Sequence, residues 1–191
     1  MFGDPYEAWH NGADFQVLLA RWREEPGLVS EMLQLGLSHS DPLAAQSIWM
    51  VAGESGDVSE LVGRLREALP QARGDFKVKV AWVLFLLTND QDFAGPICEV
   101  LAGDGFWGEK RNAAQALNIF APATAVVQAL ARGVQHEEYL VRLYSAQTLL
   151  IMAGRHTTVD KVPDLRDKIR KDGDLAAWRQ AADELLMPWT R

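Results

Sequence analysis

The chain has 191 residues, of which 48% are hydrophobic, so it can bury a continuous core as one domain or as one array of repeats. Its formal net charge is −7, and residues 1–60 hold ten acidic side chains against Arg21 and Arg23, a balance that argues against binding to nucleic-acid phosphates and favours a basic protein partner. No apolar run reaches the roughly 20 residues that span a bilayer, no secretory signal begins the chain, and Cys98 is the one cysteine, so we expect a cytoplasmic protein that does not bind membranes.

The helical pattern begins after an irregular lead-in at residues 1–13, where Asp14 is a candidate N-cap for a helix over residues 15–25. The apolar face of that helix consists of Phe15, Leu18, Leu19 and Trp22. The next helix is expected at residues 28–38, and its apolar stripe consists of Leu28, Met32 and Leu35. Asp41-Pro42 has the N-cap and N1 arrangement that begins a helix over residues 42–52. These last two helices form the first of five predicted pairs.

The other four pairs follow, with a Gly or a Pro at each break. Their predicted helices cover residues 58–69 with 75–88, 93–101 with 107–120, 123–131 with 137–153, and 159–171 with 174–187. No run alternates with period two for long enough to indicate a strand. We therefore predict an all-α chain that forms a single domain over residues 1–191. Its parts are a lead-in with a cap helix at 1–26, repeats at 27–187 and a tail at 188–191.

A repeated pattern lies in the second helix of each pair. Taking the second small residue as an anchor gives Ala45, Ala81, Ala114, Ala146 and Ala182, which are separated by 36, 33, 32 and 36 residues. A period of this length is typical of helical solenoids. The positions three after the anchor are predicted to lie in the core, and they hold Ile48, Leu84, Leu117, Leu149 and Leu185. The positions one before the anchor belong to the same face and hold Ala44, Val80, Ala113, Ser145 and Ala181.

The clearest copy of the pattern is Val141-Arg142 followed by Ser145-Ala146 and Thr148-Leu149. Three consecutive pairs carry a basic residue at the Arg142 position, namely Lys77, Lys110 and Arg142. This pattern resembles the HEAT-repeat family, including its short phycobilisome-lyase-like variant. The resemblance covers about residues 27–187 and implies a right-handed superhelix, or solenoid, of about five HEAT-like helical pairs after an N-terminal capping helix. Asp41 and Trp178 replace the basic residue in the first and last pairs, as expected of capping units.

Candidate partner-binding residues lie on the outward side of the second helices, which a solenoid would place on its concave face. They are Gln46, Val78, Trp82, Arg111, Gln115, Leu143, Gln147 and Arg179. A tryptophan among amides and arginines has the composition of a protein-binding hot spot. The alternative is that Trp82 folds onto a neighbouring repeat and closes the array. Positions four and five past the anchor are mostly apolar, Trp49 among them, and we expect them to be buried.

Catalytic and metal-binding motifs are sparse. His10 with Asp14, and His156 with Asp160, have a spacing that offers two metal ligands, but no third donor joins either pair. His136-Glu137-Glu138 is better explained by its place at the start of a helix than by acid–base chemistry. We therefore expect a protein that is not an enzyme and that holds no metal and no cofactor.

The leading interpretation is a protein–protein interaction module, acting as a scaffold, an adaptor or a small acidic inhibitor of the immunity-protein type that blocks a basic toxin. The alternative is an enzyme resembling the HEAT-like tetrapyrrole lyases or DNA glycosylases, where Trp82 and Asp183 are the aligned positions that echo the latter. The acidic balance argues against DNA, and no residue indicates a bilin pocket. The identity of the partner and the oligomeric state stay open at this stage.

Overall fold

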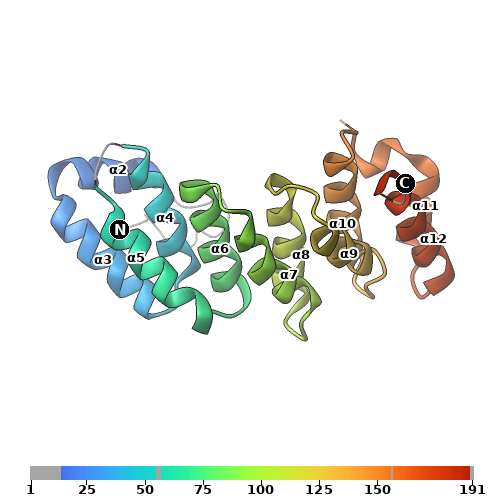
Figure 1. Ribbon diagram of the computed structural model, residues 1–191, viewed down its shortest axis with the longest axis horizontal. Helices are drawn as coiled ribbons and strands as arrows, with labels where there is room; N and C mark the ends of the chain where they lie inside the picture. The colour runs from blue at the N-terminus through green and yellow to red at the C-terminus, as the bar shows by residue number, and fades with distance from the viewer. Residues whose placement is uncertain (1–13, 55–56, 156, 190–191) are drawn as a thin grey trace. The chain divides into compact units, whose positions relative to one another are not determined.

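A computed structural model describes residues 14–54, 57–155 and 157–189 (Figure 1). Within these ranges the regular structure is helical and contains no strand, so the all-α prediction is confirmed. The α-helices are α2 (Phe15–Glu24), α3 (Pro26–Ser38), α4 (Pro42–Ala52), α5 (Ser59–Ala68), α6 (Gly74–Thr88), α7 (Ala94–Ala102), α8 (Trp107–Ala116), α9 (Thr124–Gly133), α10 (Tyr139–Met152), α11 (Pro163–Arg170) and α12 (Leu175–Leu186). Short 3-10 turns are η1 (Leu69–Gln71), η2 (Gln91–Phe93), η3 (Leu117–Ile119), η4 (Val159–Lys161) and η5 (Met187–Trp189).

Local chemistry explains where several helices begin and end. The Asp14 carboxylate accepts the Gln16 backbone N–H at 3.0 Å before α2. Asp41 accepts from the N–H of Leu43 at 2.8 Å and precedes Pro42, so both predicted start signals of α4 are confirmed. At the end of α6, Asn89 has a φ of 57° and closes the helix in the left-handed conformation.

The chain divides into two compact units, residues 1–90 and 91–191, with the boundary after α6. In the first unit, α3 packs on α4 and α5 packs on α6, while α4 lies beside α6 and α3 beside α5 (Figure 1). The helix α2 packs on both α3 and α4. The two predicted pairs therefore stack with like helices side by side, preceded by the predicted cap helix.

The second unit repeats this arrangement for its first two pairs. The helix α7 lies beside α9, and α8 lies beside α10. The last pair departs from the pattern, because α12 contacts both α9 and α10, while α11 contacts α10. The five helix pairs thus occur where the sequence predicted them, and each unit is built from packed pairs.

The predicted core of the second helices is confirmed. The anchor residues Ala45, Ala81, Ala114, Ala146 and Ala182 are buried. The aliphatic row three positions later and the row one position before are buried as well. Small anchor residues allow neighbouring helices to approach closely, which explains the recurrence of alanine.

The helix α3 buries the side opposite to the one that we predicted. Its buried residues are Val29, Leu33 and Leu37. The predicted stripe is exposed instead, with exposed fractions of 49% for Leu28, 40% for Met32 and 61% for Leu35. Both sets have helical spacing, so the period alone does not decide between them. The close approach at Gly36 decides, because an added Cβ there would lie 2.5 Å from the Cβ of Ala44 on α4.

The apolar rows four and five positions past the anchor are divided between core and surface. Phe85 and Leu150 are buried, as we predicted for both rows. Other members are exposed, namely Trp49, Ile119, Ile151 and Met187. The prediction that these rows are buried is therefore wrong for four of their positions.

Candidate functional site

An aromatic pair joins the second helices of unit one. Trp49 of α4 and Trp82 of α6 meet edge to face, with ring centroids 5.5 Å apart and an interplanar angle of 69°. Such a contact stabilises the folded state by about 0.5–1.5 kcal/mol beyond the area that it buries. The Trp82 ring is half-buried and Trp49 keeps an exposed fraction of 37%. Trp82 thus packs onto the neighbouring pair, as the alternative interpretation held, and still reaches the surface.

A cation lies beside this pair. The Lys79 Nζ is 5.2 Å from the centroid of the Trp82 ring, within the range of a cation–π contact. Burial lowers the pKa of Lys79, and the negative charge of Asp75 opposes that shift. Gln46, one turn before Trp49 on α4, is half-buried. We name the surface formed by Gln46, Trp49, Lys79 and Trp82 the aromatic face.

The third predicted residue of unit one does not reach this surface. Val78 has an exposed fraction of 2% and belongs to the core of α6. Its side chain is therefore not available to a partner. Trp49 was predicted to be buried, and Lys79 was not among the predicted residues. Each stands three positions from a predicted residue, Gln46 or Trp82, and so shares its side of the helix.

The predicted residues of unit two lie on α8, α10 and α12. The Arg111 guanidinium lies 5.7 Å from the ring centroid of Tyr144, a contact that links α8 to α10. Gln115 and Arg179 are exposed, whereas Leu143 is half-buried. Tyr144 was not predicted, because it follows Leu143 at a position that belongs to none of the predicted rows.

The side-chain amide of Gln147 forms two hydrogen bonds within the protein. Its Nε2 donates to the carbonyl of Thr157 at 2.9 Å, and its Oε1 accepts the N–H of Val159 at 3.0 Å. Both polar ends of the amide are therefore engaged by the segment between α10 and α11. A partner would have to compete with these bonds, so Gln147 is a weaker candidate for recognition than Gln115.

The basic position of the fourth pair is buried. Arg142 has an exposed fraction of 0%, and its Nε donates to the carbonyl of Ile169 at 2.7 Å. One terminal nitrogen donates to the carbonyls of His136 and Glu137, at 2.8 and 2.5 Å. The guanidinium also lies 4.1 Å from the centroid of a Trp178 ring. Arg142 therefore links α10, α11 and α12, and its buried guanidinium is not available to a partner.

The preceding basic residue lies next to a histidine. Lys110 Nζ is 3.1 Å from His136 Nε2, and His136 Nδ1 accepts the N–H of Glu138 at 3.0 Å. Burial lowers the pKa of His136, and the positive charges of Lys110 and Arg142 add to this shift. The unprotonated Nδ1 of the imidazole thus bonds the residue that precedes α10, and no side-chain hydrogen bond caps the first turn of that helix.

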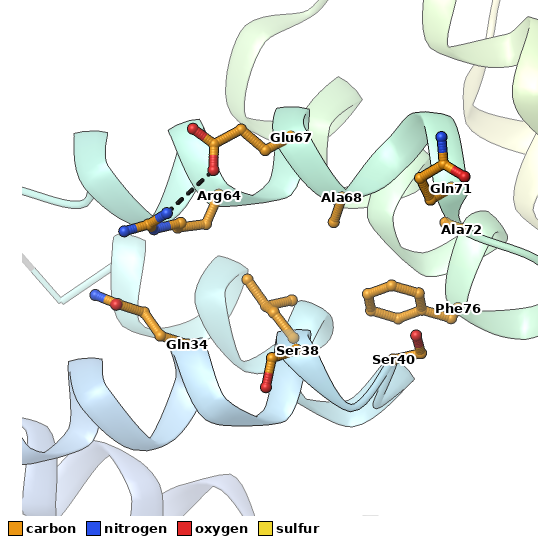
Figure 2. Close-up of a pocket in the computed structure, with 10 residues that line it drawn as sticks. Gln34, Ser38, Ser40, Arg64, Glu67, Ala68, Gln71, Ala72 and Phe76 are labelled. Carbon is orange, nitrogen blue, oxygen red and sulfur yellow. Dashed lines mark hydrogen bonds and ion pairs between the residues drawn. The ribbon is translucent and has the colours of Figure 1, made fainter.

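A cleft of about 460 Å³ lies between α3, α5 and the start of α6. Figure 2 shows Phe76 between the end of α3 and the α5–η1 segment, with the Arg64–Glu67 ion pair on α5. Most polar side chains that line the cleft form hydrogen bonds or ion pairs with other residues of the protein. Arg64 donates to Glu67 at 3.2 Å, and Gln34 donates to Glu60 at 3.1 Å. Few of its polar groups are left to orient a ligand.

Reactive groups are few in the described part of the chain. Burial raises the pKa of the Cys98 thiol to about 11, so the thiol is a poor nucleophile at neutral pH. Residues 14–54, 57–155 and 157–189 contain no group of three or more His, Cys, Asp or Glu side chains that could hold a metal ion. His10 and His156, from the two sequence pairs considered above, lie outside these ranges. Within them, no helix combines the length and apolarity needed to cross a bilayer.

The comparisons with known proteins give no relative. No protein-family model, no curated protein and no solved structure matches the chain. The resemblance to HEAT repeats therefore stays an interpretation of the sequence pattern.

Proposed function

We propose that this chain is a non-enzymatic protein-interaction module that binds a protein partner through the aromatic face. The observation that carries the proposal is the Trp49–Trp82 pair, which remains partly exposed beside Lys79. Tryptophan side chains contribute large contact areas with little loss of conformational freedom, and they are enriched among residues that dominate binding energy. A role as scaffold, adaptor or inhibitor is compatible with such a surface.

The arrangement of the face supports recognition rather than chemistry. The two rings come from adjacent helices that pack on each other, so their relative position is fixed before a partner binds. Lys79 supplies one positive charge, and Gln46 one amide, beside the two rings. We further propose that the helix pairs stack as HEAT-like repeats and that the protein acts in the cytoplasm.

The test is affinity capture from a lysate of the protein's own source, with bound proteins identified by mass spectrometry. The bait is the wild type, a Trp49→Ala/Trp82→Ala double variant or Lys79→Glu, which keeps both tryptophans. The matched control is Leu175→Ala, because Leu175 is an exposed apolar residue of unit two.

We expect a stoichiometric partner that the wild type and the control retain and that the double variant loses. Lys79→Glu should weaken the same interaction by about tenfold, because the substitution removes the cation–π contact that holds the Trp82 ring in place. Circular dichroism checks that each variant remains helical. Equal capture by the wild type and the double variant would contradict the proposal.

A further inference from the structure

Unit one has a second exposed apolar surface, which lies on α3 and not on the helices α4 and α6 that carry the aromatic face. Leu28, Met32 and Leu35 stand on α3 at positions i, i+4 and i+7, and all three are exposed. This spacing places them in one line along the helix, about two turns long. We name this line the α3 stripe. The opposite side of α3 is buried against its neighbours, so the stripe is the side that no described helix covers.

Acidic side chains border the α3 stripe. Glu31 lies one turn from both Leu28 and Leu35, and it forms no hydrogen bond or ion pair with the described residues. One turn further on, Gln34 donates to Glu60 of α5 at 3.1 Å, so a second carboxylate stands on the same edge. The same border also carries the Arg64–Glu67 ion pair, which is neutral, so Glu31 and Glu60 leave the border towards α5 negative (Figure 2).

The N-terminal end of the stripe is negative as well. Glu24 and Glu25 share a single cation, Arg21, at 3.7 and 3.2 Å. The other arginine of α2, Arg23, pairs with Glu54 at 2.6 Å and does not neutralise this end. An apolar line thus has carboxylates along one edge and at one end, with fewer cations than anions.

We propose that the α3 stripe binds an amphipathic helix of a partner protein whose apolar side is flanked by lysine or arginine. A straight line of three apolar residues on a helix matches the apolar side of a second helix packed along it. Basic flanking residues would pair with Glu31, Glu60 and the Glu24–Glu25 end. This inference does not depend on the aromatic face.

Charge also distinguishes a basic partner helix from two other possible occupants of the stripe, a second copy of the chain and residues 1–13. A second copy packed by twofold symmetry on the same stripe would bring Glu31 towards Glu31, because such an interface places one patch against itself. Residues 1–13 carry Asp4 and Glu7 and neither Lys nor Arg, so they lack the complementary charge. A basic helix from another protein fits both the apolar line and its border.

The test uses the full chain and a synthetic peptide of about 14 residues, built from leucine and lysine so that the leucines share one helical side. Two control peptides have the same leucines with glutamate in place of lysine, and the same composition in scrambled order. Isothermal titration calorimetry measures the dissociation constants at low and at high salt.

The protein variants are Leu35→Ser, Glu31→Lys and, as matched controls outside the stripe, Leu175→Ser and Asp183→Lys. Leu35 is largely exposed, so its replacement is compatible with folding. We expect the leucine–lysine peptide to bind and the two control peptides to bind at least about tenfold more weakly. Leu35→Ser should weaken binding about tenfold through lost apolar contact. Glu31→Lys should weaken it at low salt and much less at high salt.

The Trp49→Ala/Trp82→Ala variant should bind the peptide as the wild type does, which separates this surface from the aromatic face. Equal binding of the scrambled peptide, equal effects of the control variants, or no binding of the leucine–lysine peptide would overturn the proposal. Dimerisation of the wild type in sedimentation velocity, abolished by Leu35→Ser, would instead identify a second copy as the occupant and would also overturn it.

Discussion

Replacing Arg142 with alanine is expected to lower the free energy of unfolding of the chain by about 3–5 kcal/mol, because the change leaves the buried carbonyl of Ile169 without its donor and removes the contact of the guanidinium with Trp178. The guanidinium bonds the carbonyls of Ile169, His136 and Glu137 and stacks on Trp178. Each hydrogen bond from a charged donor contributes about 1.5–3 kcal/mol to stability, but the contributions do not add.

The partners of Arg142 do not contribute equally. The bond to the Ile169 carbonyl is buried, so that carbonyl has no ready replacement donor. The carboxylate of Asp172, 3.3 Å away, has an exposed side chain, and exposed ion pairs contribute about 1 kcal/mol or less. We therefore expect Asp172→Asn to be nearly neutral and the carbonyl bonds, together with the Trp178 contact, to account for most of the loss.

The assay is urea unfolding of the full chain, with hydrogen exchange of α10 to α12 as the local measurement. In thermal unfolding of the full chain, whose 191 residues correspond to roughly 2–4 °C in Tm per kcal/mol, Arg142→Ala should lower the Tm by at least about 6 °C. Arg142→Lys should fall between the wild type and alanine, since an ammonium keeps the charge but not the planar fork. A loss below about 1 kcal/mol for Arg142→Ala would refute the reasoning.

Three further predictions concern unit two. The pKa of the Cys98 thiol is raised from the ordinary 9.0 to about 11, so at pH 8 the thiol should react with a thiol reagent about a hundredfold more slowly than a free cysteine. The reaction rate should keep rising beyond pH 9. A rate equal to that of a free thiol would exclude the burial that raises the pKa. The pKa of His136 is lower in the folded state, so its contribution to stability is present above its unfolded value of about 6.5 and is lost as the pH falls through the folded value. NMR titration should show this pKa rising in Lys110→Met, and an unchanged pKa would exclude the Lys110 contact. Gly133→Ala should destabilise the chain by about 1–3 kcal/mol because the new Cβ would overlap the Ser145 hydroxyl. Adding Ser145→Ala should restore part of that loss in urea unfolding, and full independence of the two changes would contradict the overlap.

The sequence was sufficient for the helices and for the core of the second helix in each pair. Small anchors with an aliphatic residue three positions later mark one side of a helix, and the structure buries that side in all five pairs. The same reasoning failed for α3, which has apolar residues on two sides. Only the approach of Gly36 to Ala44 decides which side faces the protein, and that contact is not visible in the helical period.

The candidate site was predictable only in part for the same reason. Gln46 and Trp82 lie on adjacent packed helices, as expected from their shared row. The bonds that engage Gln147 come from the backbone of Thr157 and Val159, and backbone partners carry no signature in residue type. Nothing at Asn89-Asp90 distinguished the division between the two units from the other breaks between helix pairs.

The most direct test of the aromatic face is site-specific photocrosslinking. A benzophenone amino acid is placed at Gln46 and, for comparison, at Leu175, and each protein is irradiated in a lysate of its source. We predict one dominant crosslinked partner at Gln46, none at Leu175, and suppression by excess unlabelled wild type but not by the Trp49→Ala/Trp82→Ala protein. Equal crosslinking at both positions, or equal suppression by both competitors, would contradict the assignment of this face as the binding surface.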